Sequence, residues 1–113
     1  MSILKLAQKR HSPRAFDGRP LTWEDLADGF EAARLSSSSY NNQPWRFVVA
    51  LRGEPGFGVL LETAEASNQV WMKDAGAIVG VVANTILEKT GATDHAAMLG
   101  VGMAVGAMEL AFV

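Results

Sequence analysis

The sequence predicts an α+β fold in which a central sheet is flanked by helices. Two apolar runs of strand length, residues 46–51 and 77–83, are separated by segments whose apolar residues recur at helical spacing. The 113 residues are 49% hydrophobic and 19% charged, which suits a globular chain and argues against disorder. Helices and strands are mixed along the chain and no linker divides it. We therefore expect residues 1–113 to form a single domain.

The first predicted element is a short amphipathic helix over residues 2–10. Pro13 disfavours a helical conformation for the residue before it, so the helix should end by Ser12. A turn is expected at residues 17–20, where Asp, Gly and Pro occur together.

A second helix should begin at Thr22, because a threonine hydroxyl can accept hydrogen bonds from the backbone of the first helical turn. Leu26, Phe30 and Ala33 then recur at helical spacing. The helix should end in the serines at 36–39, which compete for backbone hydrogen bonds.

The first strand, residues 46–51, is apolar on both faces, as expected of a central strand covered by helices. Residues 57–73 are predicted to be helical, in one piece or in two pieces broken near Ser67–Asn68. A second buried strand is predicted at 77–83, followed by a polar loop at 84–93.

The last predicted element is an apolar helix over residues 94–112. It is short for a membrane span and carries Glu109, so a buried core or dimer helix is the better interpretation. Gly102 and Gly106 would let a second helix approach closely. The chain ends in an apolar, uncapped sequence, and we expect that it is cut short after this helix.

The composition excludes several classes of function. A net charge of −2 gives no basic field for nucleic acid or an anionic membrane. The absence of cysteine excludes disulfides and thiolate catalysis, and the two histidines show no metal-ligand spacing. Lys5 and Lys9 interrupt the apolar centre that a signal peptide would need, so a cytoplasmic location is expected.

Basic residues are concentrated at the start of the chain. Five of the ten lie in the first twenty positions: Lys5, Lys9, Arg10, Arg14 and Arg19. Such a cluster on an acidic protein suggests a small anionic ligand such as a phosphate, and a solvated charged face is the alternative. Pro13 keeps its neighbours extended, so Ser12 and Arg14 should share a face that Arg10 can also reach.

A second polar motif precedes the first strand, Ser38-Ser39-Tyr40-Asn41-Asn42-Gln43-Pro44-Trp45. The serines expose backbone N–H groups, and Asn41 and Gln43 offer both donors and acceptors, as the polar edge of a flavin ring would require. The alternative is an ordinary connection from helix to strand. Asp94-His95 could be an acid–base pair, but an N-cap beside a surface imidazole is the better interpretation.

Together, Arg10-x-Ser12-x-Arg14 and Ser38-Ser39-x-Asn41-x-Gln43-Pro44-Trp45 resemble the nitroreductase family of FMN-dependent oxidoreductases. The resemblance covers nearly the whole chain and includes Asn68, followed by Asp74-Ala75 and the second strand. It implies a nitroreductase-like fold of which only the N-terminal portion is present, ending after the central dimer helix. The further strands and the late basic residue of the family would then be missing.

By this resemblance, nine residues would bind FMN: Arg10, His11, Ser12, Arg14, Ser38, Ser39, Asn41, Gln43 and Asn68. The basic residues and Ser12 would contact the phosphate, the ribityl chain and the ring edge. Ser38 and Ser39 would reach the flavin of the partner in a homodimer. Trp71 stands where family members often have a lysine, which leaves one flavin contact in doubt.

The implied activity is ping-pong electron transfer, in which NAD(P)H is the co-substrate and a nitroaromatic, quinone or similar small molecule is the acceptor. No catalytic side chain and no metal is needed, because the flavin carries the chemistry. Arg14 would stabilise negative charge that develops on the flavin. The alternatives are another flavin enzyme of the same fold, a dehydrogenase or dehalogenase, a non-catalytic fragment unable to hold FMN alone, or a small protein-binding domain unrelated to flavin.

Overall fold

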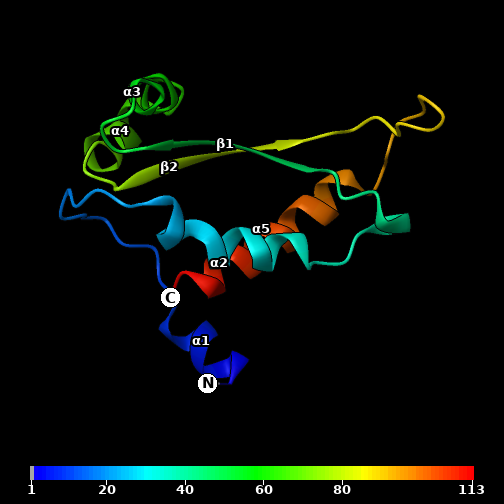
Figure 1. Cartoon of the computed structure of the whole chain (residues 1–113), viewed down its shortest axis with the longest axis horizontal. Coiled ribbons are helices and arrows are strands. Elements are labelled where there is room, and N and C mark those ends of the chain that lie inside the picture. Colours follow the sequence, from blue (N-terminus) through cyan, green and yellow to red (C-terminus); the bar gives the residue numbers. More distant parts are fainter. Residues whose placement is uncertain (1) are drawn as a thin grey trace.

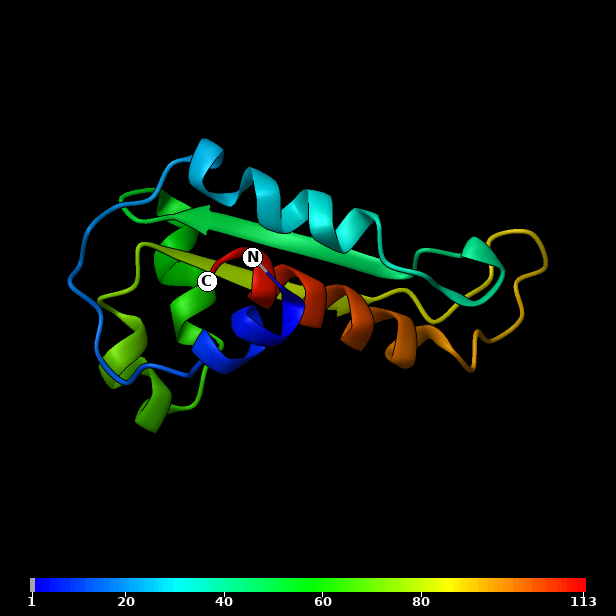
Figure 2. The ribbon, with the colours of Figure 1, turned by 90° about the horizontal axis from the view of Figure 1, so that it is seen from below.

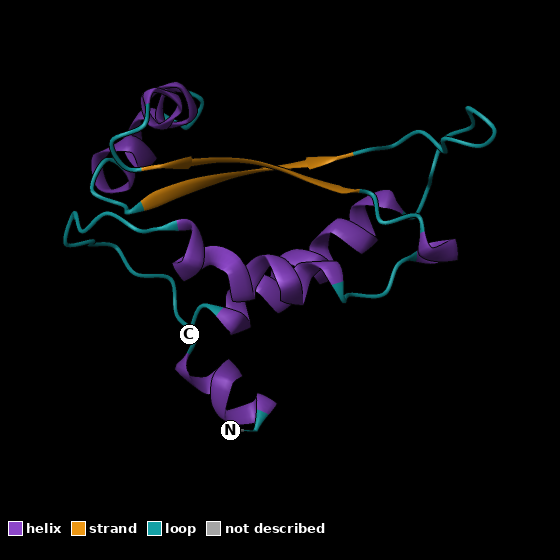
Figure 3. Cartoon of the chain, viewed as in Figure 1, coloured by secondary structure: helices purple, strands orange, loops and turns teal. Residues whose placement is uncertain are grey.

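The computed structural model describes residues 2–113 and contains a two-stranded antiparallel sheet with helices on both faces (Figures 1 and 3). The predicted α+β class is therefore confirmed. The elements, in chain order, are α1 (Ile3–Lys9), α2 (Trp23–Arg34), the 3-10 turn η1 (Ser39–Asn41), β1 (Trp45–Leu51), α3 (Pro55–Glu62), α4 (Ala66–Met72), β2 (Ala77–Ala83) and α5 (Ala97–Ala111).

The main core lies between the sheet and the pair of helices α2 and α5, which run side by side under one face (Figure 2). Ala33 of α2 and Ala104 of α5 are completely buried, and such small side chains let the two helices approach closely. Trp45 from β1 fills the space above them. The predicted apolar stripe of α2 is thus confirmed at Leu26 and Ala33, which are both buried.

The predicted start of the second helix is confirmed by a complete capping box. The Thr22 hydroxyl accepts a hydrogen bond from the Asp25 backbone N–H at 3.2 Å. In return, the Asp25 carboxylate accepts from the Thr22 backbone N–H at 2.8 Å. Two backbone donors that the helix itself cannot satisfy are paired in this way.

The predicted helical segment after the first strand does divide in two, but the expected break near Ser67–Asn68 is wrong. α3 ends at Glu62, and the chain turns through residues 63–65 before α4 begins at Ala66. The Thr63 hydroxyl donates to the Leu60 carbonyl at 2.6 Å, which satisfies an acceptor at the end of α3. Ser67 and Asn68 instead occupy the first turn of α4, where such residues are well tolerated.

The strand boundaries agree closely with the prediction, and Trp45 pairs with Ala83 at one end of the ladder. The prediction that helices cover both faces of the first strand is wrong for part of the sheet. α3 lies over Ala50 and Ile78, which are buried, but Val48 remains 52% exposed. α3 lies over one end of the sheet and runs across the strands, so the rest of this face is left open (Figures 1 and 2).

The last helix begins three residues later than predicted, at Ala97. Asp94 is not the helix N-cap, since its carboxylate accepts from the Ala96 backbone N–H in the turn before the helix. The helix is buried on one face only, because Met98 and Leu99 are each 69% exposed. Across residues 2–113, no helix has the length and apolarity that a membrane crossing would require.

Candidate functional site

The predicted binding residues fall into two groups. The first, here called the basic group, consists of Arg10, His11, Ser12, Arg14 and Asn68. All of its members are exposed. Arg10 caps α1 in an extended conformation, so the helix ends before Ser12, as predicted. Arg14 has no ion-pair partner among residues 2–113, so its five N–H donors are available to a ligand.

Two members of the basic group have contacts within the chain. The Arg10 Nε atom lies 4.0 Å from Oε2 of Glu109, near the carboxyl end of α5. The His11 Nδ1 atom lies 3.4 Å from the Lys9 carbonyl oxygen. Both contacts are long and exposed, so they leave the side chains free to reorient toward a ligand.

An aromatic contact that was not predicted from the sequence holds the segment that follows Arg14 against α4. The ring of Phe16 stacks on Trp71 with centroids 5.9 Å apart. The Gly18 N–H then donates to the Asp74 carbonyl at 3.0 Å. The segment therefore passes beside α4, the helix that carries Asn68 (Figure 2).

The second group, here called the amide loop, spans residues 38–43 and contains Ser38, Ser39, Asn41 and Gln43. Its backbone is unusual, because Tyr40, Asn41 and Gln43 have φ angles of 51°, 53° and 48°. Non-glycine residues rarely adopt this left-handed region. The Ser38 hydroxyl accepts from the Gln43 N–H at 3.0 Å and closes the loop.

The amide loop packs on the amino-terminal end of α5, where a glycine makes room for it. A Cβ atom on Gly100 would lie 3.1 Å from Cγ of Pro44 and 3.5 Å from Cβ of Ser38. The missing side chain therefore allows the loop to sit directly on the helix.

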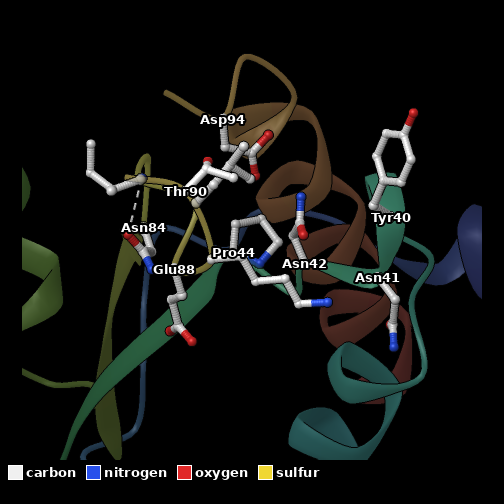
Figure 4. A pocket seen from close by; sticks show the side chains of 11 residues that line it. Tyr40, Asn41, Asn42, Pro44, Asn84, Glu88, Thr90 and Asp94 are labelled. Atoms are coloured by element: carbon white, nitrogen blue, oxygen red, sulfur yellow. Dashed lines mark hydrogen bonds between the residues drawn. The ribbon is translucent and has the colours of Figure 1, made fainter. Parts of the chain in front are cut away.

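A cavity of about 600 Å³ adjoins the amide loop (Figure 4). One wall is formed by residues 40–42 and Pro44, and the other by the segment after β2, residues 84–90 with Asp94. The Asn84 N–H donates to the Pro44 carbonyl at 2.7 Å. This bond joins the two walls at the end of the sheet where β1 begins and β2 ends. In the sequence, residues 84–93 are recognisable only as a polar loop, and their polarity is the one signal that points to this wall.

The two groups do not come together within one chain. The amide loop lies at the amino-terminal end of α5 and the basic group at its carboxyl-terminal end, and Figures 1 and 2 show these at opposite ends of the molecule. Gly100 and Glu109 are nine residues apart, about 14 Å along the helix axis at ~1.5 Å per residue. The predicted FMN-binding residues are therefore divided between the two ends of α5.

The matches to known proteins include the same two groups of residues. The nitroreductase family profile matches residues 7–56, which include the amide loop and most of the basic group. A provisionally named NAD(P)H nitroreductase of Streptococcus pyogenes is 33% identical over 87 residues, which is 77% of this chain and 42% of that protein. The oxygen-insensitive NAD(P)H nitroreductase of Enterobacter cloacae is 36% identical over 92 residues, 78% of this chain and 42% of that protein.

Comparison of the fold with solved structures also points to the nitroreductase family. A solved structure described as an oxidoreductase containing FMN superposes with a TM-score of 0.84 at 31% identity, covering 91% of this chain and 54% of that one. A nitroreductase family protein of Streptococcus pneumoniae superposes with a TM-score of 0.80. It is 21% identical and the match covers 97% of this chain and 70% of that one. The nitroreductase-like fold is confirmed, and the chain spans about two fifths of the length of the curated relatives it matches.

Proposed function

Because this chain belongs to the nitroreductase family in sequence and in fold, we propose that it forms part of an FMN-dependent oxidoreductase that uses NAD(P)H. The relatives that are 33% and 36% identical over the aligned residues are named as NAD(P)H nitroreductases. The solved structure that matches at 31% identity contains FMN.

The chemistry of the basic group fits FMN. The Arg14 guanidinium, which has no ion-pair partner within the described residues 2–113, can hold a phosphate or a polar ring edge through two parallel hydrogen bonds. Ser12 and Asn68 are exposed and add a hydroxyl and an amide. His11 can contribute its ring or its backbone N–H.

We also propose that the protein is a homodimer with FMN at the interface, because the amide loop and the basic group lie at opposite ends of α5. A two-fold axis across α5 would place the amide loop of one copy beside the basic group of the other, and would do so twice. The outward face of α5 suits this contact, since it is apolar and Gly102 and Gly106 leave open space for a second helix.

Bound FMN would supply the transfer of electrons from NAD(P)H to a small acceptor such as a nitroaromatic or a quinone. NAD(P)H and the acceptor would occupy the same site one after the other. The residues of this chain would bind and orient. Arg14 would place positive charge near the pyrimidine edge of the ring and favour its anionic form. Asn41 and Gln43 would pair with ring N–H and carbonyl groups from the neighbouring subunit. The expected setting is the cytoplasm.

Visible absorption spectroscopy of the purified 113-residue chain tests the proposal. We expect added FMN to show the band shifts of a bound flavin, and NADPH or NADH to bleach them. An FMN spectrum that stays that of the free cofactor at excess protein would contradict FMN binding by this chain, and would favour the alternative of a fragment that cannot hold the cofactor alone.

A further inference from the structure

We infer that Arg46 is a positioning residue that fixes the conformation of the amide loop for cofactor binding. This inference rests on the proposed function and adds to it a residue outside both predicted groups. Arg46 follows Trp45 at the start of β1 and is exposed on the sheet face that α2 and α5 do not cover.

The amide loop needs external support. Three of its non-glycine residues, Tyr40, Asn41 and Gln43, lie in the left-handed region within four positions. Tyr40 is 96% exposed, so its own side chain contributes almost no packing to hold this shape. Such backbone persists only where neighbouring contacts fix it.

Arg46 supplies the contact that the loop itself lacks. Its Nη1 atom donates to the Gln43 carbonyl at 2.8 Å and to the Trp45 carbonyl at 2.7 Å. The Gln43 N–H is already held by the Ser38 hydroxyl at 3.0 Å. Both backbone polar groups of Gln43 are therefore paired, one of them with a charged donor, and charged donors give the stronger hydrogen bonds.

The same guanidinium reaches the opposite wall of the cavity. Its Nη2 atom lies 3.5 Å from Oε1 of Glu88, one of the residues that line the cavity in Figure 4. Arg46 is not among the lining residues, so it acts through Gln43 and Glu88 rather than on a ligand. Arg46 therefore links the two walls of the cavity without lining it.

The test compares Arg46→Met with the conservative Arg46→Lys and with Arg52→Met as the matched control. Arg52 makes an equivalent contact at the far end of the sheet, where its Nη1 atom donates to the Lys73 and Ala75 carbonyls. Two quantities are measured: hydrogen exchange of the Gln43 amide in the FMN-free protein, and the FMN dissociation constant from flavin fluorescence. Far-UV circular dichroism and thermal melting show whether each variant is folded.

We expect Arg46→Met to raise both the exchange rate of the Gln43 amide and the FMN dissociation constant by about five- to tenfold, the ratio that loss of one hydrogen bond produces. Arg46→Lys should recover part of each loss, because an ammonium can still donate to the Gln43 carbonyl. Arg52→Met should leave Gln43 exchange unchanged and raise exchange near residues 73–76.

Unchanged Gln43 exchange in folded Arg46→Met would overturn the inference, whatever happens to FMN. Faster exchange with wild-type FMN affinity would also overturn it, because the loop would then be held for another purpose. Absence of FMN binding in the wild-type chain would instead count against the proposed function, while the exchange data would still show whether Arg46 holds the loop. Should Arg46→Met fail to fold, Arg46→Thr provides the same two measurements with the same expected increases, because threonine suits a strand and is too short to reach the Gln43 carbonyl. Unchanged Gln43 exchange in that variant would likewise overturn the inference.

Discussion

The Arg10 Nε atom lies 4.0 Å from Oε2 of Glu109, so the carboxyl end of α5 lies beside the basic group. The other end of the same helix supports the amide loop through Gly100. The two predicted groups therefore lie at the two ends of α5. This relationship leads to the proposal that two copies of the chain complete each other.

Replacing Glu109 by glutamine should strengthen FMN binding. In the proposed site Glu109 would compete with the phosphate for the Arg10 guanidinium. An exposed ion pair of this kind is worth at most about 1 kcal/mol, so the dissociation constant should fall by up to about fivefold. Titration followed by flavin fluorescence measures it. Glu62→Gln, which removes an equally exposed charge on α3, serves as the control and should leave the affinity unchanged.

Replacing Trp71 by alanine should release the segment that follows the basic group. The Phe16–Trp71 stack is expected to stabilise that segment by about 0.5–1.5 kcal/mol. Limited proteolysis should then cut between residues 10 and 17 more rapidly than in the wild type, and FMN should bind more weakly. Trp23→Ala, which removes a half-exposed tryptophan at the start of α2, should change neither result; equal cleavage in both variants would argue against a specific role for the stack.

Replacing Gly29 by alanine should destabilise the fold. A Cβ atom at position 29 would overlap the Phe112 ring, which rests on the α2 backbone at this glycine. Overpacking of this kind costs about 1–3 kcal/mol, seen as a lower midpoint of urea unfolding. The control is Gly58→Ala in α3, where a Cβ meets open space and the helix should gain about 0.5–1 kcal/mol. A Gly29→Ala protein as stable as the wild type would show that Phe112 does not pack at this position.

Acid should weaken the start of α2. Hydrogen bonds from the Thr22 backbone and hydroxyl hold the pKa of the Asp25 carboxyl below its ordinary value. A depressed folded-state pKa stabilises the fold fully above the ordinary carboxyl pKa of about 4, and this stabilisation is lost as the pH falls through the lower folded-state value. Urea midpoints of wild type and Asp25→Asn should therefore differ at pH 7 and converge toward pH 2. A difference that is independent of pH would contradict this role of the carboxylate.

The local signals in the sequence were sufficient to predict the elements whose causes are local. Thr22 is the expected N-cap, and the strands at Trp45–Leu51 and Ala77–Ala83 follow the apolar runs. The break between α3 and α4 was misplaced because Ser67 and Asn68 are compatible with a first helical turn as well as with a helix end. Propensity alone does not distinguish the two.

Contacts between distant segments could not be predicted in this way. The stacking of Phe16 on Trp71 joins residues separated by two helices and a strand, and no pattern in the sequence indicates it. Arg46 likewise reads as an ordinary polar residue at the start of a strand until its bond to the Gln43 carbonyl is seen. The two predicted groups were identified by resemblance, and their separation to opposite ends of α5 became visible only in the structure.

The most direct test of the central claim, a site shared between two copies, is a complementation experiment with Arg14→Ala and Asn41→Ala. Each variant alone should bind FMN poorly, since one half of every site is damaged. After the two are unfolded, mixed in equal amounts and refolded, half of the dimers should be mixed and each should contain one intact site, so that FMN binding returns to about a quarter of the wild-type capacity. A mixture that binds no more FMN than the separate variants would show that the two groups do not serve the same site, and would contradict the account.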